Sequence, residues 1–382
     1  MLLVAGGIFR EVVLDEDCDR ARELRLAGSG LYAAVAAARL GTAVTLLAPV
    51  GNEDADIARG LCENAGVRAV LLETKGTSAT FVVDRRAGAH PRAQYRPTGE
   101  APRAVAAGLS GDVVLVFGHP EWDPLADPML QSLAARETLV FDGQGWLSRK
   151  PRLEASRLDA GRHVELCNAE EAIAREADDT AAALARLPEA GFSTTVVKDG
   201  RWGLTVCARD TARRMVAPFA GTVQQTIGSG DVFAGAFAAA LERADTVIDA
   251  CEQGARAAAA WIFGEGPLPG EDFAERVDRL RDAPRGAAVP PEIVRGSEAT
   301  IRHSIDLGSS LLASEVSATV QELGVRTREQ STTGRPHVTL ELVGATLELD
   351  PGSREPRASV AERVCELVAD ALAGLAGRSA AP

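Results

Sequence analysis

Short apolar runs that alternate with longer alanine-rich stretches are the feature that most restricts how this chain can fold. The runs are rich in Val and Leu, and each is followed by a turn and then by apolar residues at helical spacing. This alternation is typical of βα units on a largely parallel sheet. Strands this apolar need cover on both faces, so we expect a three-layer α/β sandwich. We predict strands at residues 2–5, 42–48, 113–117, 138–141, 163–167 and 194–198, and helices at 31–40, 54–65, 169–176 and 179–187.

A change in composition near residue 285 predicts a domain boundary. The chain has 382 residues, more than the roughly 100 to 200 of one typical domain. The Pro, Gly and Ala stretch DAPRGAAVPP follows a predicted charged helix at 271–281. We therefore expect a first domain over residues 1–285 and a small α+β domain over 286–382. Within the second we predict strands at 299–305, 337–342 and 345–349, and helices at 309–323 and 359–375.

The role of the second domain is open at this point. Its alternating runs, such as HVTLEL, suit a half-exposed sheet that could pair with another chain. A homodimer is one expectation, and a passive structural cap is the alternative.

Composition and charge exclude several classes of protein. Hydrophobic residues make up 46% of the chain, enough for a full core, and the formal net charge of −13 would repel nucleic acid and anionic membranes. The start, MLLVAGGIFREVV, resembles a strand rather than a cleavable leader, and no apolar run could span a bilayer, so we expect a cytoplasmic protein. The six cysteines are scattered singly, which predicts buried free thiols rather than a disulfide or zinc framework.

The segment TIGSGDVFAGAF, residues 226–237, is the strongest functional signal. A Gly-Ser-Gly turn precedes an acidic residue and the start of an alanine-rich helix. Amides of Gly228, Ser229 and Gly230 at a helix N-terminus would stabilise an anion such as a phosphoryl group in transit. The Asp231 carboxylate could accept the proton of an attacking hydroxyl. Asp near a helix start is also a common cap, and the local sequence leaves both interpretations open.

This segment resembles the C-terminal signature of the PfkB or ribokinase family, DTxGAGDxFxxGF. It departs from the signature at Gln225, where the signature has an Asp that helps to hold potassium, so potassium activation is not expected. The matching residues are Thr226, Gly228, Gly230, Asp231, Phe233 and Phe237, and Gly235 lies one position before the last Gly of the signature.

The resemblance implies a ribokinase-like kinase domain that uses ATP and Mg²⁺. It implies phosphorylation of a hydroxyl of a small molecule, which would be a sugar or other polyol, a cyclitol or a nucleoside. Asp231 would be the general base, and the turn from Gly228 to Gly230 would be the anion hole.

Further segments resemble the family on the acceptor side. The AGSG run at residues 27–30 is similar to the glycine motif at which backbone approaches substrate, which assigns Gly28 and Gly30 to it, although Tyr32 replaces the usual Asn. VGNED at 50–54 is similar to the VGxDxxG segment, and residues 77–84 to the strand after a substrate-contacting loop. Glu11 lies in the register of an Asp that binds substrate hydroxyls; a solvated charge is the alternative. The short interval from Glu11 to residue 27 predicts a short or absent β-lid.

Three more segments resemble the nucleotide side of the family. NAEE at 168–171 matches the NxxE motif, in which Glu171 organises the magnesium and phosphate environment and Asn168 faces the nucleotide; a capping box is the alternative. Lys198, Gly200 and Gly203 resemble the nucleotide loop, and an ordinary turn is the alternative. Together with Thr226, these residues are the predicted ATP contacts.

The segment DGQGWL, residues 142–147, follows a predicted strand and takes the place of the family's DxN segment, which assigns Asp142 to substrate. It is similar to a DxQGxxR variant in compact-lid members, including inositol kinase-like proteins. His119, after the strand at 113–117, could touch substrate or have no role. Since ligands of open α/β sheets bind at the carboxyl ends of strands, we expect these segments to form one site.

A rival hypothesis is a nucleotide- or sugar-binding regulatory module that kept the fold and lost efficient catalysis. Gln225, Tyr32, the expected lack of a lid and the added domain favour it. The presence of Asp231 between its flanking glycine turn and helix favours an enzyme.

Overall fold

The computed structural model describes two compact units. One comprises residues 1–87, 91–178 and 182–286, and the other comprises 88–90, 179–181 and 287–382. The described residues are 1–14, 21–84, 92–96, 109, 111–119, 138–144, 162–168, 171, 193–198, 200, 203–208, 211–215, 226–264, 266–282, 298–304, 313, 316, 326–332, 338–342 and 345–349.

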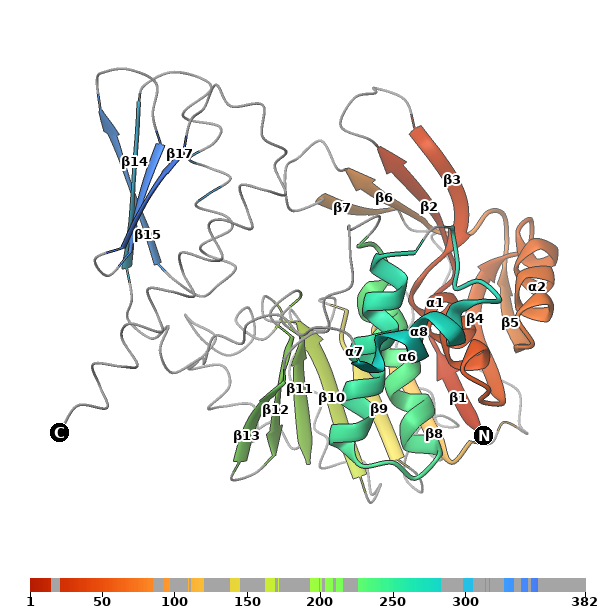
Figure 1. Ribbon diagram of the computed structural model, residues 1–382. Helices are drawn as coiled ribbons and strands as arrows, with labels where there is room; N and C mark the ends of the chain where they lie inside the picture. Colours follow the sequence, from red (N-terminus) through yellow and green to blue (C-terminus); the bar gives the residue numbers. More distant parts are fainter. Residues whose placement is uncertain are drawn as a thin grey trace. The chain divides into compact units, whose positions relative to one another are not determined.

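The first unit is built on a nine-stranded sheet with the order β13-β12-β11-β10-β9-β8-β1-β4-β5 (Figure 1). All pairings from β5 across to β11 are parallel, and β12 is antiparallel to both of its neighbours. The α/β class with a mostly parallel central sheet is therefore confirmed, and each of the predicted strands of this unit is present. The bounds are β1 (Leu2–Ala5), β4 (Val44–Gly51), β5 (Arg68–Thr74), β8 (Val113–Phe117), β9 (Thr138–Asp142), β10 (Arg162–Asn168), β11 (Thr194–Lys198), β12 (Leu204–Ala208) and β13 (Thr211–Met215).

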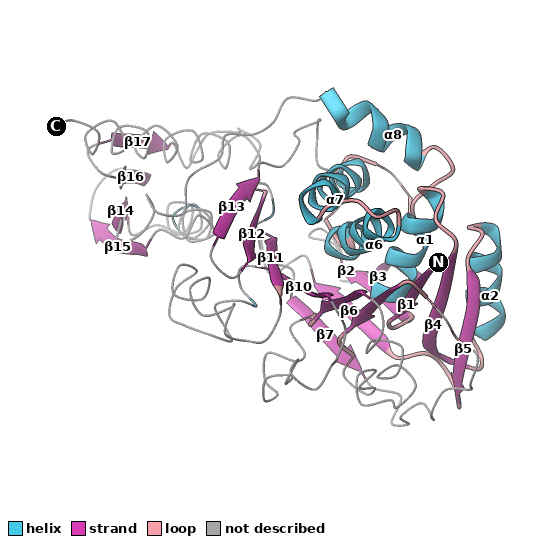
Figure 2. Ribbon diagram, turned by 90° about the horizontal axis from the view of Figure 1, so that it is seen from below, coloured by secondary structure: helices cyan, strands magenta, loops and turns pink. Residues whose placement is uncertain are grey.

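Three helices cover one face of this sheet: α1 (Ser29–Arg39), α6 (Ser229–Glu242) and α7 (Val247–Ile262) (Figure 2). The fully buried strands β1 and β8 pack under them, which explains why these strands have no polar face. A side chain at Gly235 of α6 would collide with the α1 backbone at Ala33, so this glycine allows the two helices to touch. The other helices among the described residues of this unit are α2 (Ala55–Asn64), α8 (Phe273–Arg279) and the 3₁₀ turn Leu280–Asp282.

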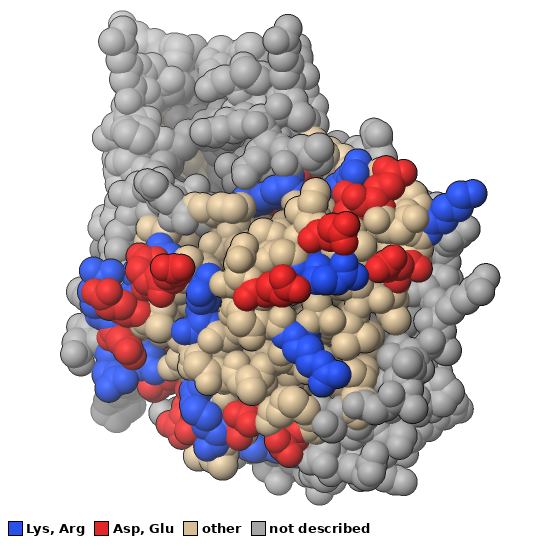
Figure 3. All heavy atoms as spheres, turned by 90° about the vertical axis from the view of Figure 1, so that its right-hand side faces the viewer, with Lys and Arg blue, Asp and Glu red and all other residues tan. Residues whose placement is uncertain are grey.

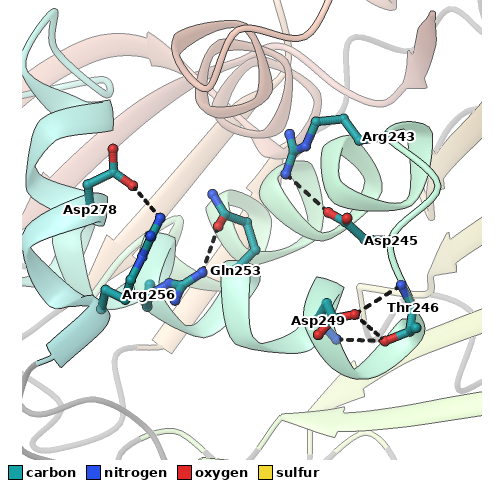
Figure 4. A network of polar contacts seen from close by, with 8 residues as sticks. Arg243, Asp245, Thr246, Asp249, Gln253, Arg256 and Asp278 are labelled. Carbon is teal, nitrogen blue, oxygen red and sulfur yellow. Dashed lines mark hydrogen bonds and ion pairs between the residues drawn. The ribbon is translucent and has the colours of Figure 1, made fainter.

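Helix α7 begins with a capping box (Figure 4). The Asp249 amide donates to Thr246 Oγ1 at 3.2 Å, and the Thr246 amide donates to Asp249 Oδ2 at 3.3 Å. Such a cap stabilises a helix by about 1 kcal/mol. It defines the start of the helix whose far end carries Trp261, a residue of the candidate site.

A second sheet, the lid sheet, has four strands in the order β3-β2-β6-β7 (Figure 1). The prediction of a short or absent lid is therefore wrong. The interval after Glu11 still accommodates a hairpin, and β6 and β7 join it from a segment that lies far along the chain. The bounds are β2 (Phe9–Leu14), β3 (Ala21–Ala27), β6 (Thr80–Asp84) and β7 (Arg92–Arg96).

The second unit contains a four-stranded sheet with the order β15-β14-β16-β17. The predicted strands correspond to β14 (Glu298–Ser304), β16 (Val338–Leu342) and β17 (Ala345–Leu349). The sequence did not predict β15 (Arg326–Thr332), which has no apolar residue and pairs in parallel with β14. Of the helix predicted at 309–323 only Ala313 and Val316 are described, both buried, and the helix predicted at 359–375 lies outside the described residues.

Charges of both signs are interspersed on the face shown in Figure 3, where acidic side chains form no single patch. Arg59 on α2 pairs with Asp56 at 2.8 Å and with Glu73 at 3.3 Å. The described cysteines are free and buried, as predicted, and they are Cys62, Cys167, Cys207 and Cys251. Among the described helices, none combines the length and apolar character needed to cross a bilayer.

Candidate active site

The bend before α6 is a left-handed turn at Gly228, with φ of +79°. A Cβ atom there would lie 2.8 Å from the ring of Tyr32, so both the backbone angle and the space require glycine. The residues from Ile227 to Asp231 are half-buried and Thr226 is exposed. A ligand can therefore reach the bend.

The amides of this bend do not all face outward as predicted. The Ser229 N–H donates to the Thr226 carbonyl at 3.1 Å, so the assignment of Ser229 to the anion hole is wrong. In the described part of the chain, the amides of Gly228, Gly230 and Asp231 have no hydrogen-bond partner. The first turn of a helix leaves such N–H groups unpaired, and they favour an anion. Unpaired amides thus lie on either side of Ser229.

Two aromatic residues pack against the bend. The Trp261 indole donates to the carbonyl of Ile227 at 2.7 Å, and its ring lies 5.5 Å from that of Tyr32. Tyr32 is 1% exposed and donates its hydroxyl to Glu11 Oε2 at 3.0 Å. The Tyr in place of the family's Asn therefore packs beneath the bend. Sequence analysis missed Trp261; the only available signal is that a buried indole N–H usually needs an acceptor.

A cluster of polar side chains surrounds Asp231. Gln144 Nε2 donates to Asp231 Oδ1 at 2.7 Å and to Asp142 Oδ1 at 3.3 Å. Lys198 Nζ donates to Asp142 Oδ2 at 2.6 Å and lies 3.3 Å from the place of a Cβ on Gly230. The ends of β9 and β11 and the start of α6 therefore meet at one edge of the sheet. Both oxygens of Asp142 thus accept hydrogen bonds from the protein, and the assignment of Asp142 to substrate stays a prediction.

The electrostatics of this cluster favour a proton acceptor near neutral pH. Burial, followed by the charge of Asp142, raises the pKa of Asp231 to about 7, and Lys198 and Gln144 partly oppose the rise. Burial alone would lower the pKa of Lys198, but Asp142 and then Glu171 raise it above its ordinary value. Lys198 is therefore a permanent cation beside the bend.

Asn168 and Glu171 form a reciprocal cap. This capping box was the alternative to their predicted role beside the nucleotide and magnesium. The Glu171 amide donates to Asn168 Oδ1 at 2.7 Å, and the Asn168 amide donates to Glu171 Oε2 at 2.9 Å. Glu171 also lies close enough to Lys198 to affect its pKa. Among the described residues no group of three or more metal-ligating side chains is present. Mg²⁺ commonly takes one or two carboxylates and completes its shell with phosphates and water, and a single Glu171 fits that pattern.

The predicted nucleotide loop contains a tight turn after β11. Gly200 and Gly203 have φ of +53° and +91°, and the Gly203 amide donates to the Gly200 carbonyl at 3.1 Å. The ordinary turn that was the alternative is thus present. It is compatible with a nucleotide contact, because the turn follows Lys198 at the same sheet edge.

On the lid side, Glu11 is 3% exposed, so the alternative of a solvated charge is wrong. Arg25 pairs with Glu11 Oε2 at 2.7 Å, the oxygen that also accepts from Tyr32. The charge of Glu11 also contributes, as the smallest of the causes, to the raised pKa of Asp231.

Aromatic rings lie next to Glu11. Phe81 on β6 is its register partner in the parallel β2–β6 pair. Phe9 stacks on Phe81 with ring centroids 6.3 Å apart and on the buried His119 at 5.2 Å. The lid therefore combines aromatic surface with a buried ion pair.

The glycine motif allows the backbone at residues 28–30 to pack closely against the backbone at residues 6 and 7. A Cβ on Gly28, where φ is +117°, would lie 2.6 Å from the Gly7 carbonyl oxygen, and a Cβ on Gly30 would lie 2.6 Å from that of Gly6. The motif thus packs directly on the end of β1, at the place where the lid begins.

The VGNED segment ends in Asp54, which is 3% exposed and ties the lid to the core. Asp54 accepts from Arg10 on β2 at 2.7 to 3.1 Å and from the Ser78 amide at 2.7 Å. Sequence analysis missed this pair.

Gln225, which bears on the predicted lack of potassium activation, lies outside the described residues.

Comparisons with known proteins bear on the fold of the first unit. The sequence model described as "pfkB family carbohydrate kinase" matches residues 148–271. Ribokinase from Thermotoga maritima is 21% identical with a TM-score of 0.59, covering 73% of this chain and 98% of that chain. Ribokinase from Cryptococcus neoformans var. grubii in complex with ADP is 18% identical with a TM-score of 0.58, covering 74% of this chain and 98% of that chain.

A pyrophosphate-dependent kinase in the ribokinase family, complexed with a pyrophosphate analog and myo-inositol, is also similar. It is 16% identical with a TM-score of 0.56, covering 72% of this chain and 99% of that chain. At these identities, the likeness to solved structures establishes the ribokinase-like fold. No curated protein sequence matches this chain.

Proposed function

We propose that this chain, a PfkB-like carbohydrate kinase by its family match and its fold, transfers the γ-phosphoryl group of ATP to a hydroxyl of a sugar, cyclitol or nucleoside. One observation carries this proposal. The half-buried Asp231 lies at the start of α6, next to unpaired amides and within the same polar cluster as Lys198. A proton acceptor and an anion site thus occupy adjoining positions.

Asp231 acts as the general base in this proposal. A base is most effective when its pKa lies near the working pH, and the pKa of Asp231 is raised to about 7 by burial and by Asp142. Its Oδ1 atom accepts from Gln144, while no partner of Oδ2 exists among the described residues. Oδ2 is therefore the atom that takes the proton of the acceptor hydroxyl.

The bend and Lys198 stabilise the transferred group. Catalysis of phosphoryl transfer is mostly positioning and charge stabilisation, because the transition state spreads negative charge over the phosphoryl oxygens. The amides of Gly230 and Asp231 and the Lys198 ammonium supply positive charge from fixed positions. Held in advance by Asp142, Lys198 needs no rearrangement during the reaction.

ATP and Mg²⁺ would lie along the ends of β10 and β11. Lys198 and the turn from Gly200 to Gly203 would contact the nucleotide, together with Asn168 and Thr226, and Glu171 would hold Mg²⁺ through water. When bound, Mg²⁺ neutralises phosphate charge.

The acceptor would lie between the bend and the lid sheet. Arg25 and Tyr32 both donate to Oε2 of Glu11, so this carboxylate, with about four acceptor positions, retains capacity for a substrate hydroxyl. Phe9 and Phe81 offer an apolar surface to the same acceptor. The four-stranded lid and the packing of Tyr32 remove two arguments for a regulatory module without catalysis.

A substrate panel tests the proposal. The purified full chain with Mg²⁺ is incubated with sugars, inositols and nucleosides, with either ATP or pyrophosphate as the donor, and the phosphorylated products are measured. We expect ATP-dependent product from at least one acceptor class. If nucleotide raises the melting temperature and yet no acceptor is phosphorylated from ATP, the binding module is the better explanation. Transfer from pyrophosphate alone would overturn the choice of donor.

A further inference from the structure

Gln144 is a residue without an assigned role that touches the proposed base. It follows β9 directly, and its side-chain amide lies between two carboxylates, at 2.7 Å from Asp231 Oδ1 and 3.3 Å from Asp142 Oδ1. Since both partners are carboxylates, the NH₂ group must face them, and both of its hydrogens are available to donate. The amide therefore bridges two groups that would otherwise repel each other.

The backbone of Gln144 is strained. Its φ is +52°, and within the described residues only Gln144 and Ala244 have positive φ without being glycine. Gln has no special tolerance of this region, unlike Gly or Asn. The turn is held in place locally, because the Gln144 amide donates to Asp142 Oδ1 at 3.2 Å and the Gly118 amide donates to the Asp142 carbonyl at 2.8 Å. Strain of this kind at a site that contacts a base indicates a functional constraint.

The contact also makes the two oxygens of the Asp231 carboxylate different. Gln144 occupies Oδ1, and in the described part of the chain Oδ2 has no partner. A carboxylate held by one oxygen presents the other in a defined direction, which is what proton transfer from a bound hydroxyl requires.

We propose that Gln144 is the positioning residue of the base: its amide orients the Asp231 carboxylate and links it, through Asp142, to Lys198 at the anion-binding bend. This proposal rests on the proposed kinase function. It adds a residue that acts through Asp231 and has no contact with substrate of its own.

The electrostatics support this role. The charged groups around Asp231 are Asp142 from β9, Lys198 from β11 and Glu11 from β2, with Glu171 beyond Lys198. Burial and Asp142 raise the pKa of Asp231, whereas the hydrogen bond from Gln144 lowers it. Loss of the amide should therefore raise the pKa of the base, and loss of the Asp142 charge should lower it.

The test compares the pH dependence of kcat/KM in the wild type, Gln144→Leu and Asp142→Asn. We expect the acidic limb to move up by about one pH unit in Gln144→Leu and down in Asp142→Asn. The plateau at high pH should also fall by about 10-fold in Gln144→Leu, because the carboxylate is no longer oriented. A general loss of stability cannot produce shifts of opposite sign.

A second variant separates positioning from folding. Gln144→Gly relieves the left-handed backbone and removes the amide, so we expect a higher melting temperature than in Gln144→Leu but the same shift of the acidic limb. An unchanged limb in both variants, or shifts of the same sign in Gln144→Leu and Asp142→Asn, would overturn the proposal.

A measurement that needs no turnover keeps this proposal distinct from the kinase function. Carbon-13 NMR of chains labelled at the Asp carboxyl carbon follows the titration of Asp231, whose signal is identified by its absence in Asp231→Asn. We expect a higher pKa in Gln144→Leu than in the wild type. If no acceptor is ever phosphorylated, the proposed function fails, and the NMR titration still decides whether Gln144 controls the Asp231 carboxyl.

Discussion

The two sides of the candidate active site hold their charges in different ways. At the sheet edge, Lys198, Asp142 and Asp231 are held by one another and by Gln144, and Asp231 retains a raised pKa. On the lid side, Glu11 forms a close ion pair with Arg25 and accepts a hydrogen bond from the hydroxyl of Tyr32. The first arrangement gives a carboxyl whose pKa is raised to about 7, whereas the second holds its carboxylate in a buried ion pair. We infer that the sheet edge carries the chemistry and that the lid selects the acceptor.

The largest expected effect comes from Asp231→Asn, which should lower kcat by about 10²- to 10⁴-fold, because the base is lost while its shape is kept. Nucleotide binding, measured by calorimetry, should persist. Asp56→Asn on the exposed face of α2 is the matched control and should retain full activity. Near-normal turnover of Asp231→Asn would contradict the proposal that the general base lies at the sheet edge.

Gly228→Ala should have the next largest effect. The methyl group would meet the Tyr32 ring at 2.8 Å and the residue would keep a φ of +79°, so the bend must shift and kcat should fall by about 10-fold or more. Gly41→Ala is the control, because Gly41 has a φ of +84° with open space around it. Both variants should melt at lower temperature, and only Gly228→Ala should lose activity. Equal activities would show that the shape of the bend does not matter.

The pH dependence of stability tests the raised pKa of Asp231 at the sheet edge. Because the pKa of Asp231 rises from 3.8 to about 7 on folding, the folded chain keeps a proton that the unfolded chain has released between about pH 4 and pH 7. The free energy of unfolding contributed by this group therefore falls as pH rises through that window. Asp231→Asn lacks this titration, so its melting temperature should exceed that of the wild type at pH 8 and approach it at pH 4. A constant difference from pH 4 to pH 8 would contradict the raised pKa.

Tyr32→Phe should have the smallest effect. It removes the hydroxyl that donates to Glu11 and keeps the ring beneath the bend, while Arg25 continues to neutralise the carboxylate. We expect the KM for the acceptor to rise a few-fold, consistent with about 1 kcal/mol for one hydrogen bond, with kcat nearly unchanged. Initial-rate kinetics over a range of acceptor concentrations measure this split. A fall in kcat with constant KM would show that Tyr32 acts in the chemical step rather than in binding the acceptor.

Two strands show where sequence reasoning succeeds and where it fails. The run at 113–117 is wholly apolar, and its strand has the predicted bounds because burial on both faces requires that pattern. The strand Arg326–Thr332 has no apolar residue, so only its parallel partner Glu298–Ser304 identifies it. The four-stranded lid was missed for a related reason, since its strands come from segments that are far apart in the chain.

The sequence by itself determined the α/β class, the glycine turn before α6 and the acid beside it, because apolar periodicity and glycine placement are local properties of the chain. Only the tertiary structure decided that the Ser229 amide is consumed within the turn, that Tyr32 and Trp261 support it, and that Gln144 reaches Asp231. These outcomes depend on which loops meet at the ends of parallel strands. Hydrogen bonds between distant segments leave no periodic trace in the sequence, because they require a direction and a distance that only the folded chain supplies.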